Sequence, residues 1–185
     1  MPQKAAQAKL APYSRLSQGF HWISALLVFA IVPIGLYMAD LPKTDPTRAG
    51  WFALHKSLGI TILALTVGRA VWRHLAPPPP LNGLLPALQE RIAKIEYMFL
   101  YLLLLFMPVT GYVMSAAGNH PVGFFGLFTL PNLVPVSEPL AEGAEFVHVS
   151  SQYGLYALLV LHIGAVAFHG IVKRDGLAGR MIRGG

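Results

Sequence analysis

Residues 147–172 read VHVSSQYGLYALLVLHIGAVAFHGIV, an apolar stretch as long as a membrane-spanning helix. It contains His148 and His162, fourteen positions apart. At about 100° per residue the two imidazoles lie roughly 40° apart on one helix face, with a rise of about 21 Å. An imidazole in hydrocarbon is costly unless something binds it, so such a histidine marks a candidate functional site. Two ligands on one stripe, near opposite leaflets, fit two stacked metal centres.

The composition of the whole chain is that of a membrane protein. Of its 185 residues, 55% are hydrophobic and only 12% are charged, against about 25% charged in an ordinary soluble domain. Cysteine is absent, which excludes disulfides, thiolate-bound iron–sulfur clusters and covalent haem attachment through a C-x-x-C-H motif. Any metal must therefore be held by histidine, carboxylate or methionine.

Apolar runs elsewhere in the chain predict three further spans. A hydrocarbon core of about 30 Å needs roughly 20 apolar residues in a helix, and the four stretches that meet this requirement are 18–38, 52–72, 95–116 and 147–172. The proline run 77–80 cannot continue a helix and marks the second loop, whereas Pro33 and Pro108 lie inside spans and should kink them. We expect one all-α domain over residues 1–185, an integral membrane four-helix bundle.

The distribution of basic residues predicts the orientation, because lysine and arginine gather in cytoplasmic loops. One side of the predicted bundle has only Lys43, Arg48 and Lys56. The other has Lys4, Lys9, Arg15, Arg69, Arg73, Arg91, Lys94, Lys173, Arg174, Arg180 and Arg183. Both termini are therefore expected in the cytoplasm, with the chain as a multi-pass membrane protein. The net charge of +6 is then a topology signal, and we expect no nucleic-acid partner.

Four histidines pair by their depth in these spans: His55 with His148, and His21 with His162. Each pair places imidazoles from two helices at comparable depth, as six-coordinate haem requires. The alternative for any single histidine is a hydrogen-bonding role between helices. His169 matches the depth of His21 about as well as His162 does, but a separation of about 31 Å from His148 would put the two centres at opposite membrane surfaces. We therefore favour His162 as the ligand, and His169 as a near-surface group able to carry protons.

Three arginines on the predicted cytoplasmic side, Arg15, Arg69 and Arg73, are candidates to pair with haem propionates. Simple anchoring at the membrane surface is an equally good explanation for each of them. The two remaining histidines, His74 and His120, lie at the end of the second span and in the third loop. We expect both of them to be exposed to solvent.

An ordered set of short motifs resembles the bacterial cytochrome b561 family, over almost the whole chain from Tyr13 to Asp175. The motifs are Tyr13-Ser14-Arg15-Leu16 with His21-Trp22; His55-x-Ser57-x-Gly59 followed by Arg69 and Arg73; Tyr101 with Pro108 and Gly111; Phe125-Gly126-Leu127 with Leu130-Pro131; and His148, Leu161-His162 and His169 before Lys173-Arg174-Asp175.

The resemblance implies a multi-pass protein of the bacterial inner membrane. It implies two non-covalent b-type haems with His21, His55, His148 and His162 as axial ligands. It also implies ubiquinone as electron acceptor, at a site near the cytoplasmic haem to which His169 contributes. One family member is a superoxide oxidase, so the resemblance suggests superoxide as the periplasmic donor. This chain departs from the family pattern at Tyr97, close to Lys94 and Glu96, where the family has histidines that are not haem ligands.

Other features bear on the donor. Lys43, Arg48 and Lys56 lie close to His55 in the sequence and could attract an anionic radical. Three glutamates in the other periplasmic loop could cancel that field, namely Glu138, Glu142 and Glu145.

Two other functions remain open from the sequence. The chain could be the cytochrome b anchor subunit of a larger dehydrogenase. It could also be a histidine-based metal-ion transporter, although Glu96 is the only acidic residue near a membrane interior position.

Overall fold

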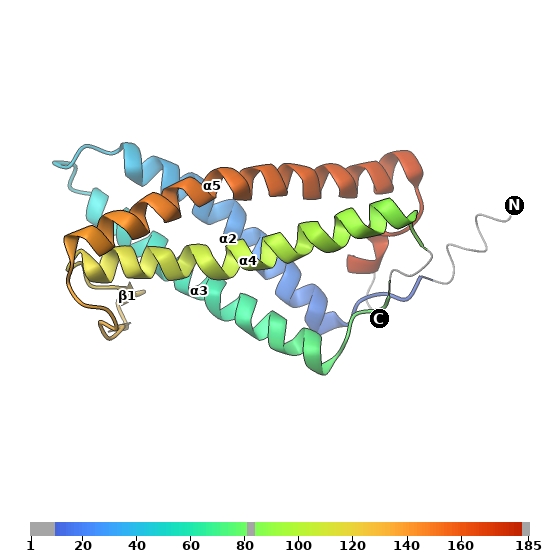
Figure 1. Cartoon of the computed structure of the whole chain (residues 1–185), viewed down its shortest axis with the longest axis horizontal. Helices are drawn as coiled ribbons and strands as arrows, with labels where there is room; N and C mark the ends of the chain where they lie inside the picture. Colours follow the sequence, from blue (N-terminus) through green and yellow to red (C-terminus); the bar gives the residue numbers. More distant parts are fainter. Residues whose placement is uncertain (1–9, 81–83, 183–185) are drawn as a thin grey trace, which may run out of the picture.

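The computed structural model describes residues 10–80 and 84–182 and consists mainly of four long helices (Figure 1). They are α2 (Arg15–Asp40), α3 (Arg48–Leu75), α4 (Ala87–Ala117) and α5 (Glu138–Ala167). A π-helical turn, η1 (Phe168–Lys173), continues α5, and all four helices are long and apolar enough to cross a membrane. The prediction of an all-α, four-helix transmembrane bundle is confirmed, and each expected span lies within one of these helices. Lys4, Lys9 and Arg183 lie outside the described residues.

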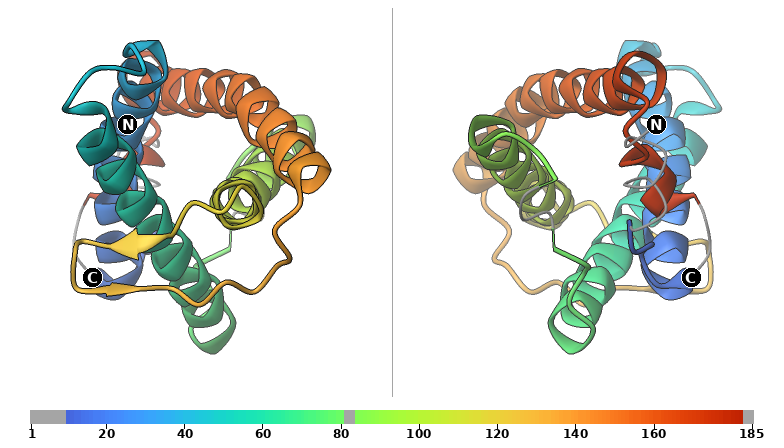
Figure 2. Two further views of the ribbon diagram at one scale, coloured as in Figure 1. Left: turned by 90° about the vertical axis from the view of Figure 1, so that its left-hand side faces the viewer. Right: turned by 90° about the vertical axis from the view of Figure 1, so that its right-hand side faces the viewer.

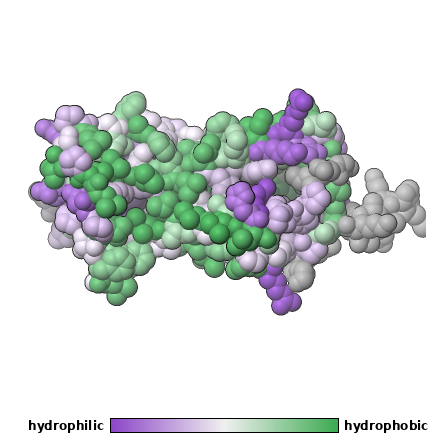
Figure 3. Space-filling model, turned by 60° about the horizontal axis from the view of Figure 1, so that its bottom comes forward, coloured by the Kyte–Doolittle hydropathy of each residue, from purple (hydrophilic) through white to green (hydrophobic). Residues whose placement is uncertain are grey.

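The helices surround the long axis of the molecule in chain order (Figure 2). Helix α5 packs along α4, α4 packs on α3, and α3 packs on α2, but α5 makes no comparable contact with α2 or α3. Pro33 and Pro108 lie inside α2 and α4, and both helices continue past them. On the face shown in Figure 3, apolar residues gather around the middle of the molecule and hydrophilic residues lie toward its ends. The bundle therefore opens between α5 and the α2–α3 pair.

One end of the bundle, here called the hairpin end, has a small β-hairpin in the α4–α5 connection. Its strands β1 (Gly123–Phe124) and β2 (Phe128–Thr129) pair antiparallel, a feature that the all-α expectation did not include. Ser57 of α3 anchors it, since its hydroxyl accepts a hydrogen bond of 2.9 Å from the Phe125 N–H and lies 3.3 Å from the Gly123 carbonyl. The connection is thus fixed close to His55.

The opposite end, here called the terminal end, brings both ends of the described chain beside the α3–α4 connection (Figure 1). A 3-10 helix, η2 (Ala178–Met181), carries Arg180, whose side chain is only 3% exposed. The Arg180 guanidinium donates to the carbonyls of Ala11 and Pro79 at 2.9 and 2.7 Å. Arg180 was expected only as one of many cytoplasmic basic residues, whereas it ties three segments of the chain together.

Candidate haem sites

Two pairs of imidazoles face each other across the opening between α5 and the α2–α3 pair. At the hairpin end, His55 of α3 and His148 of α5 have ring centroids 6.2 Å apart. Toward the terminal end, His21 of α2 and His162 of α5 have centroids 6.1 Å apart. These are the two pairs that depth along the spans predicts. They link α5 to the two helices with which it otherwise has little contact.

Backbone glycines make room for the imidazoles at the hairpin end. A Cβ atom on Gly35 of α2 would lie 3.0 Å from His55 Cε1, and one on Gly111 of α4 would lie 3.0 Å from His148 Cε1. Real Cβ atoms almost never come closer than that, so a larger residue would push against either ring. Each ring is therefore held against a neighbouring helix as well as by its own.

The Nδ1 nitrogens of His148 and His162 donate hydrogen bonds to oxygen atoms of α4. His148 Nδ1 lies 2.8 Å from the Met107 carbonyl, which makes this nitrogen the donor and leaves Nε2 without a proton. His162 Nδ1 lies 2.9 Å from Glu96 Oε1. By contrast, Nδ1 of His55 is buried and makes no well-formed hydrogen bond, although the ring interacts with the Ile31 backbone. Hydrogen bonds from Nδ1 to a carbonyl or a carboxylate orient a histidine that binds a metal through its other nitrogen, Nε2.

The three remaining histidines belong to neither pair. His169, in η1, contacts Asp175, with Nδ1 and Oδ2 2.5 Å apart. Asp175 is held in turn by the backbone N–H of Leu177, which donates to its Oδ1 at 3.1 Å. His74 and His120 are exposed, as expected. The structure therefore brings His162, and not His169, to His21.

The three arginines singled out from the sequence lie at the terminal end. Arg69 is close enough to His21 to interact with it electrostatically, and its guanidinium lies 5.3 Å from the centre of the Tyr101 ring. Arg73 lies 4.8 Å from the centre of the Tyr97 ring. Within residues 10–80 and 84–182, neither has a carboxylate within 4 Å. Arg15 is exposed at the start of α2, so Arg69 is the best placed of the three beside a histidine pair.

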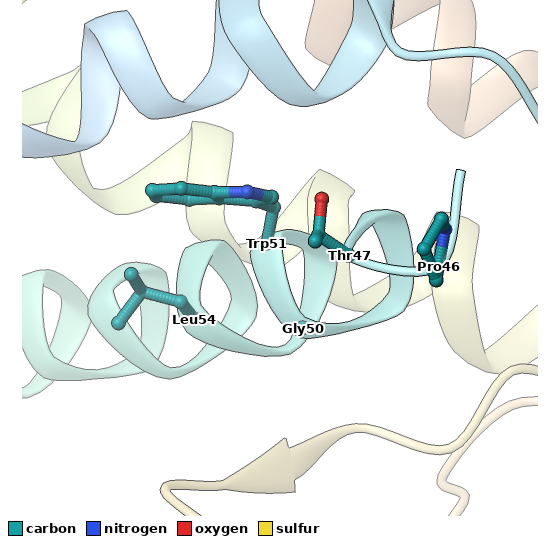
Figure 4. Close-up of a pocket in the computed structure, with 5 residues that line it drawn as sticks. All are labelled: Pro46, Thr47, Gly50, Trp51 and Leu54. Carbon is teal, nitrogen blue, oxygen red and sulfur yellow. The ribbon is translucent and has the colours of Figure 1, made fainter.

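A surface pocket of about 360 Å³ lies at the start of α3, and none of the paired histidines lines it (Figure 4). Its lining residues carry no titratable side chain; they are Pro46, Thr47, Gly50, Trp51 and Leu54. The histidine pairs, rather than this pocket, gather the chemically active groups of the molecule.

Comparison with known proteins identifies the family. The family model for prokaryotic cytochrome b561 matches residues 12–184. The chain belongs to this family. It is 32% identical to cytochrome b561 homolog 2 of Escherichia coli, over 92% of this chain and 90% of the relative. It is 27% identical to the probable superoxide oxidase CybB of Yersinia pestis, over 92% of this chain and 95% of that protein.

Membership of the cytochrome b561 family, together with the four apolar helices, makes the chain a membrane electron-transfer protein. It is a multi-pass protein of the bacterial inner membrane, and the family implies that it binds haem b. These conclusions agree with the class, cofactor type and location predicted from the sequence. They do not favour the metal-ion transporter.

The paired imidazoles fit a haem in their spacing and in their donor type. An imidazole nitrogen binds a metal ion at about 2.0 to 2.1 Å, and its ring centroid lies about 1 Å further back, so two imidazoles on opposite sides of one iron have centroids about 6 Å apart. Both observed separations, 6.2 and 6.1 Å, agree with this value. Two axial ligands are enough, since the porphyrin supplies the other four. In the described part of the chain, no larger histidine and carboxylate cluster could chelate a metal.

Glu96 and the Met107 carbonyl are the contacts that sequence reasoning missed at these sites. The Met107 carbonyl carries no signal in a sequence, because every residue has one. Glu96 did carry a signal, as the only acid near a membrane interior position, and that alone marks a residue in a span as functional.

Proposed function

We propose that this cytochrome b561 holds two b haems and passes electrons between a periplasmic donor and the quinone pool. In this proposal His55 and His148 hold one haem, and His21 and His162 hold the other. The observation that carries it is the pair of centroid separations close to 6 Å, repeated at two depths on α5. His148 and His162 lie about 21 Å apart along the helix, so the two sites are stacked across the hydrocarbon layer.

The proposed orientation places the terminal end in the cytoplasm. Support comes from the excess of lysine and arginine at that end, which includes Arg69, Arg73 and Lys173. A reporter enzyme that works only in the cytoplasm should be active when it is fused to the C-terminus, and one that works only in the periplasm should be inactive there. Activity of a periplasmic reporter at that position would contradict the orientation.

The residues of the chain select electron transfer over oxygen chemistry. A haem with two imidazole ligands exchanges single electrons and has no open coordination position. His148 is oriented by the Met107 carbonyl, and His162 by Glu96, so that Nε2 of each is directed away from α4. Arg69, beside His21, is a candidate to pair with a propionate, in a charge-assisted hydrogen bond.

Ubiquinone is the proposed acceptor, at the terminal end. Its reduction takes two electrons and two protons, so the site needs a group that can deliver protons from water. His169 and Asp175 together form such a group, since the imidazole lies at the terminal end of the bundle and contacts the carboxylate directly. His169 would take up a proton from water at Nε2, where the Asp175 carboxylate stabilises the resulting imidazolium through Nδ1–H, and would then pass that proton to the quinone oxygen.

Superoxide is the proposed donor, at the hairpin end. The proposal rests on the similarity to a probable superoxide oxidase at 27% identity and on positive charge near His55. Lys56 donates from Nζ to the Pro121 carbonyl at 3.2 Å, and Arg48 donates to the Leu41 carbonyl at 3.3 Å. Both cations are therefore held at this end, where they would draw an anionic radical toward the site. The exposed glutamates Glu138, Glu142 and Glu145 oppose them.

The experiment that tests the di-haem proposal is the haem content of the purified protein. We expect two b haems per chain, and one in each of H55A and H148A, because loss of either ligand destroys the same site. H120A is a matched control, since it removes an exposed imidazole at the same end. One haem per chain in the unaltered protein would contradict the proposal, and subunits that co-purify with it would instead favour an anchor role.

A further inference from the structure

A carboxylate inside the bundle contacts one of the paired histidines. Glu96 of α4 lies 2.9 Å from His162 Nδ1, and its side chain is only 17% exposed. At the hairpin end, His148 has the neutral Met107 carbonyl in the equivalent place, and His55 interacts with the neutral backbone of Ile31. The two sites therefore differ by one full negative charge in direct contact with an imidazole.

The cations near Glu96 are engaged elsewhere. Lys94 pairs with Glu90 at 2.6 Å, and the guanidinium of Arg73 lies over the Tyr97 ring. Arg69 interacts electrostatically with His21, and its guanidinium lies 5.3 Å from the centre of the Tyr101 ring. Within the described residues, His162 is the only basic group that lies within 4 Å of the Glu96 carboxylate. The charge of Glu96 is therefore directed at that imidazole.

We propose that Glu96 is a positioning residue that lowers the reduction potential of the haem held by His21 and His162. The inference rests on the proposed function, because it requires His162 to be an axial ligand. A carboxylate that accepts the Nδ1–H bond makes the imidazole more basic and places negative charge one ligand away from the iron. Both effects stabilise the ferric state. Hydrogen bonds to a charged acceptor are about twice as strong as those to a neutral one, so His162 is affected more than His148.

The lower potential would favour one direction of electron transfer. A lower potential at the terminal-end site makes its reduced form a stronger reductant toward a quinone bound beside it. Hydrogen bonding to the ligand is one of the few ways in which a protein can set two chemically identical haems apart. Glu96 would thus give the second site its own potential without any change of ligand.

The test is a potentiometric titration of E96Q, in which the glutamine oxygen can still accept the His162 hydrogen bond. We expect two haems per chain and two midpoints, of which one rises. We expect that midpoint to rise by about 59 mV. For a one-electron couple this raises the reduced-to-oxidised ratio about tenfold at a fixed potential. The low-spin electron paramagnetic resonance signal of the same haem should change as well. E90Q is the matched control, because it removes the same charge from the same helix about 9 Å away and should shift neither midpoint appreciably.

A second variant assigns the shift to one site. In H55A, which should keep only the terminal-end haem, adding E96Q should raise the single remaining midpoint by the same amount. If E96Q keeps both haems but moves neither midpoint, or moves both midpoints equally, the inference is wrong while the proposed ligands stand. If H162A keeps two haems, the ligand assignment is wrong whatever E96Q does.

Discussion

Gly111 leaves the space that the His148 imidazole occupies: a Cβ atom on residue 111 would lie 3.0 Å from His148 Cε1 and 3.1 Å from Nδ1. The His148 ring cannot move away easily, because its Nδ1 is held by the carbonyl of Met107, which lies one turn before Gly111 on α4. The glycine is thus part of the proposed haem site, although it carries no functional group.

We therefore expect G111A to lose haem from the hairpin-end site and to fall from two haems per chain toward one. Alanine stabilises a helix by about 1 kcal/mol relative to glycine, so weaker helix formation cannot explain a loss. G143A in α5 is the matched control, since a Cβ there meets nothing within 4 Å. Full haem content in G111A would show that the ring adjusts and that the close approach has no role.

The contact between His169 and Asp175 predicts the effect of changing the carboxylate. D175N should keep both haems but slow quinone reduction at least tenfold, since a correctly placed proton-transfer group contributes about a hundredfold or more. D40N, at the hairpin end, is the matched control and should reduce quinone at the unaltered rate. Equal rates in D175N and the unaltered protein would remove this pair from the proton path.

Positive charge near His55 predicts a salt-dependent reaction with superoxide. In stopped-flow measurements on the oxidised protein, K56Q should slow haem reduction several-fold at low ionic strength, and the difference should shrink as salt screens the field. K173Q, at the terminal end, should behave like the unaltered protein. Slow reduction that ignores both ionic strength and K56Q would leave a quinone-linked cytochrome with another donor.

Much of this architecture could be predicted from the sequence, since it follows from one-dimensional patterns. Span length and hydropathy locate the four helices, and the histidine spacing on 147–172 predicts two depths. Depth alone could not separate His162 from His169. The structure distinguishes them by their contacts, because Asp175 lies against His169 and leaves His162 opposite His21.

Other parts of the site depend on contacts between distant residues and have no local pattern. Gly35 and Gly111 look like any other glycines in membrane helices, which are common at helix contacts. Glu96 is 66 positions from His162, so its role needs the packing of α4 against α5. Arg180 resembles a surface anchor in the sequence, yet is buried by the three segments that it joins.

We propose that His21 and His162 share one haem while His55 and His148 share the other. The haem contents of purified H162A and H169A distinguish this assignment from one in which His169 is the ligand. The account predicts one b haem per chain in H162A and two in H169A, with the remaining haem of H162A lost when H148A is added. Two haems in H162A together with one in H169A would contradict it.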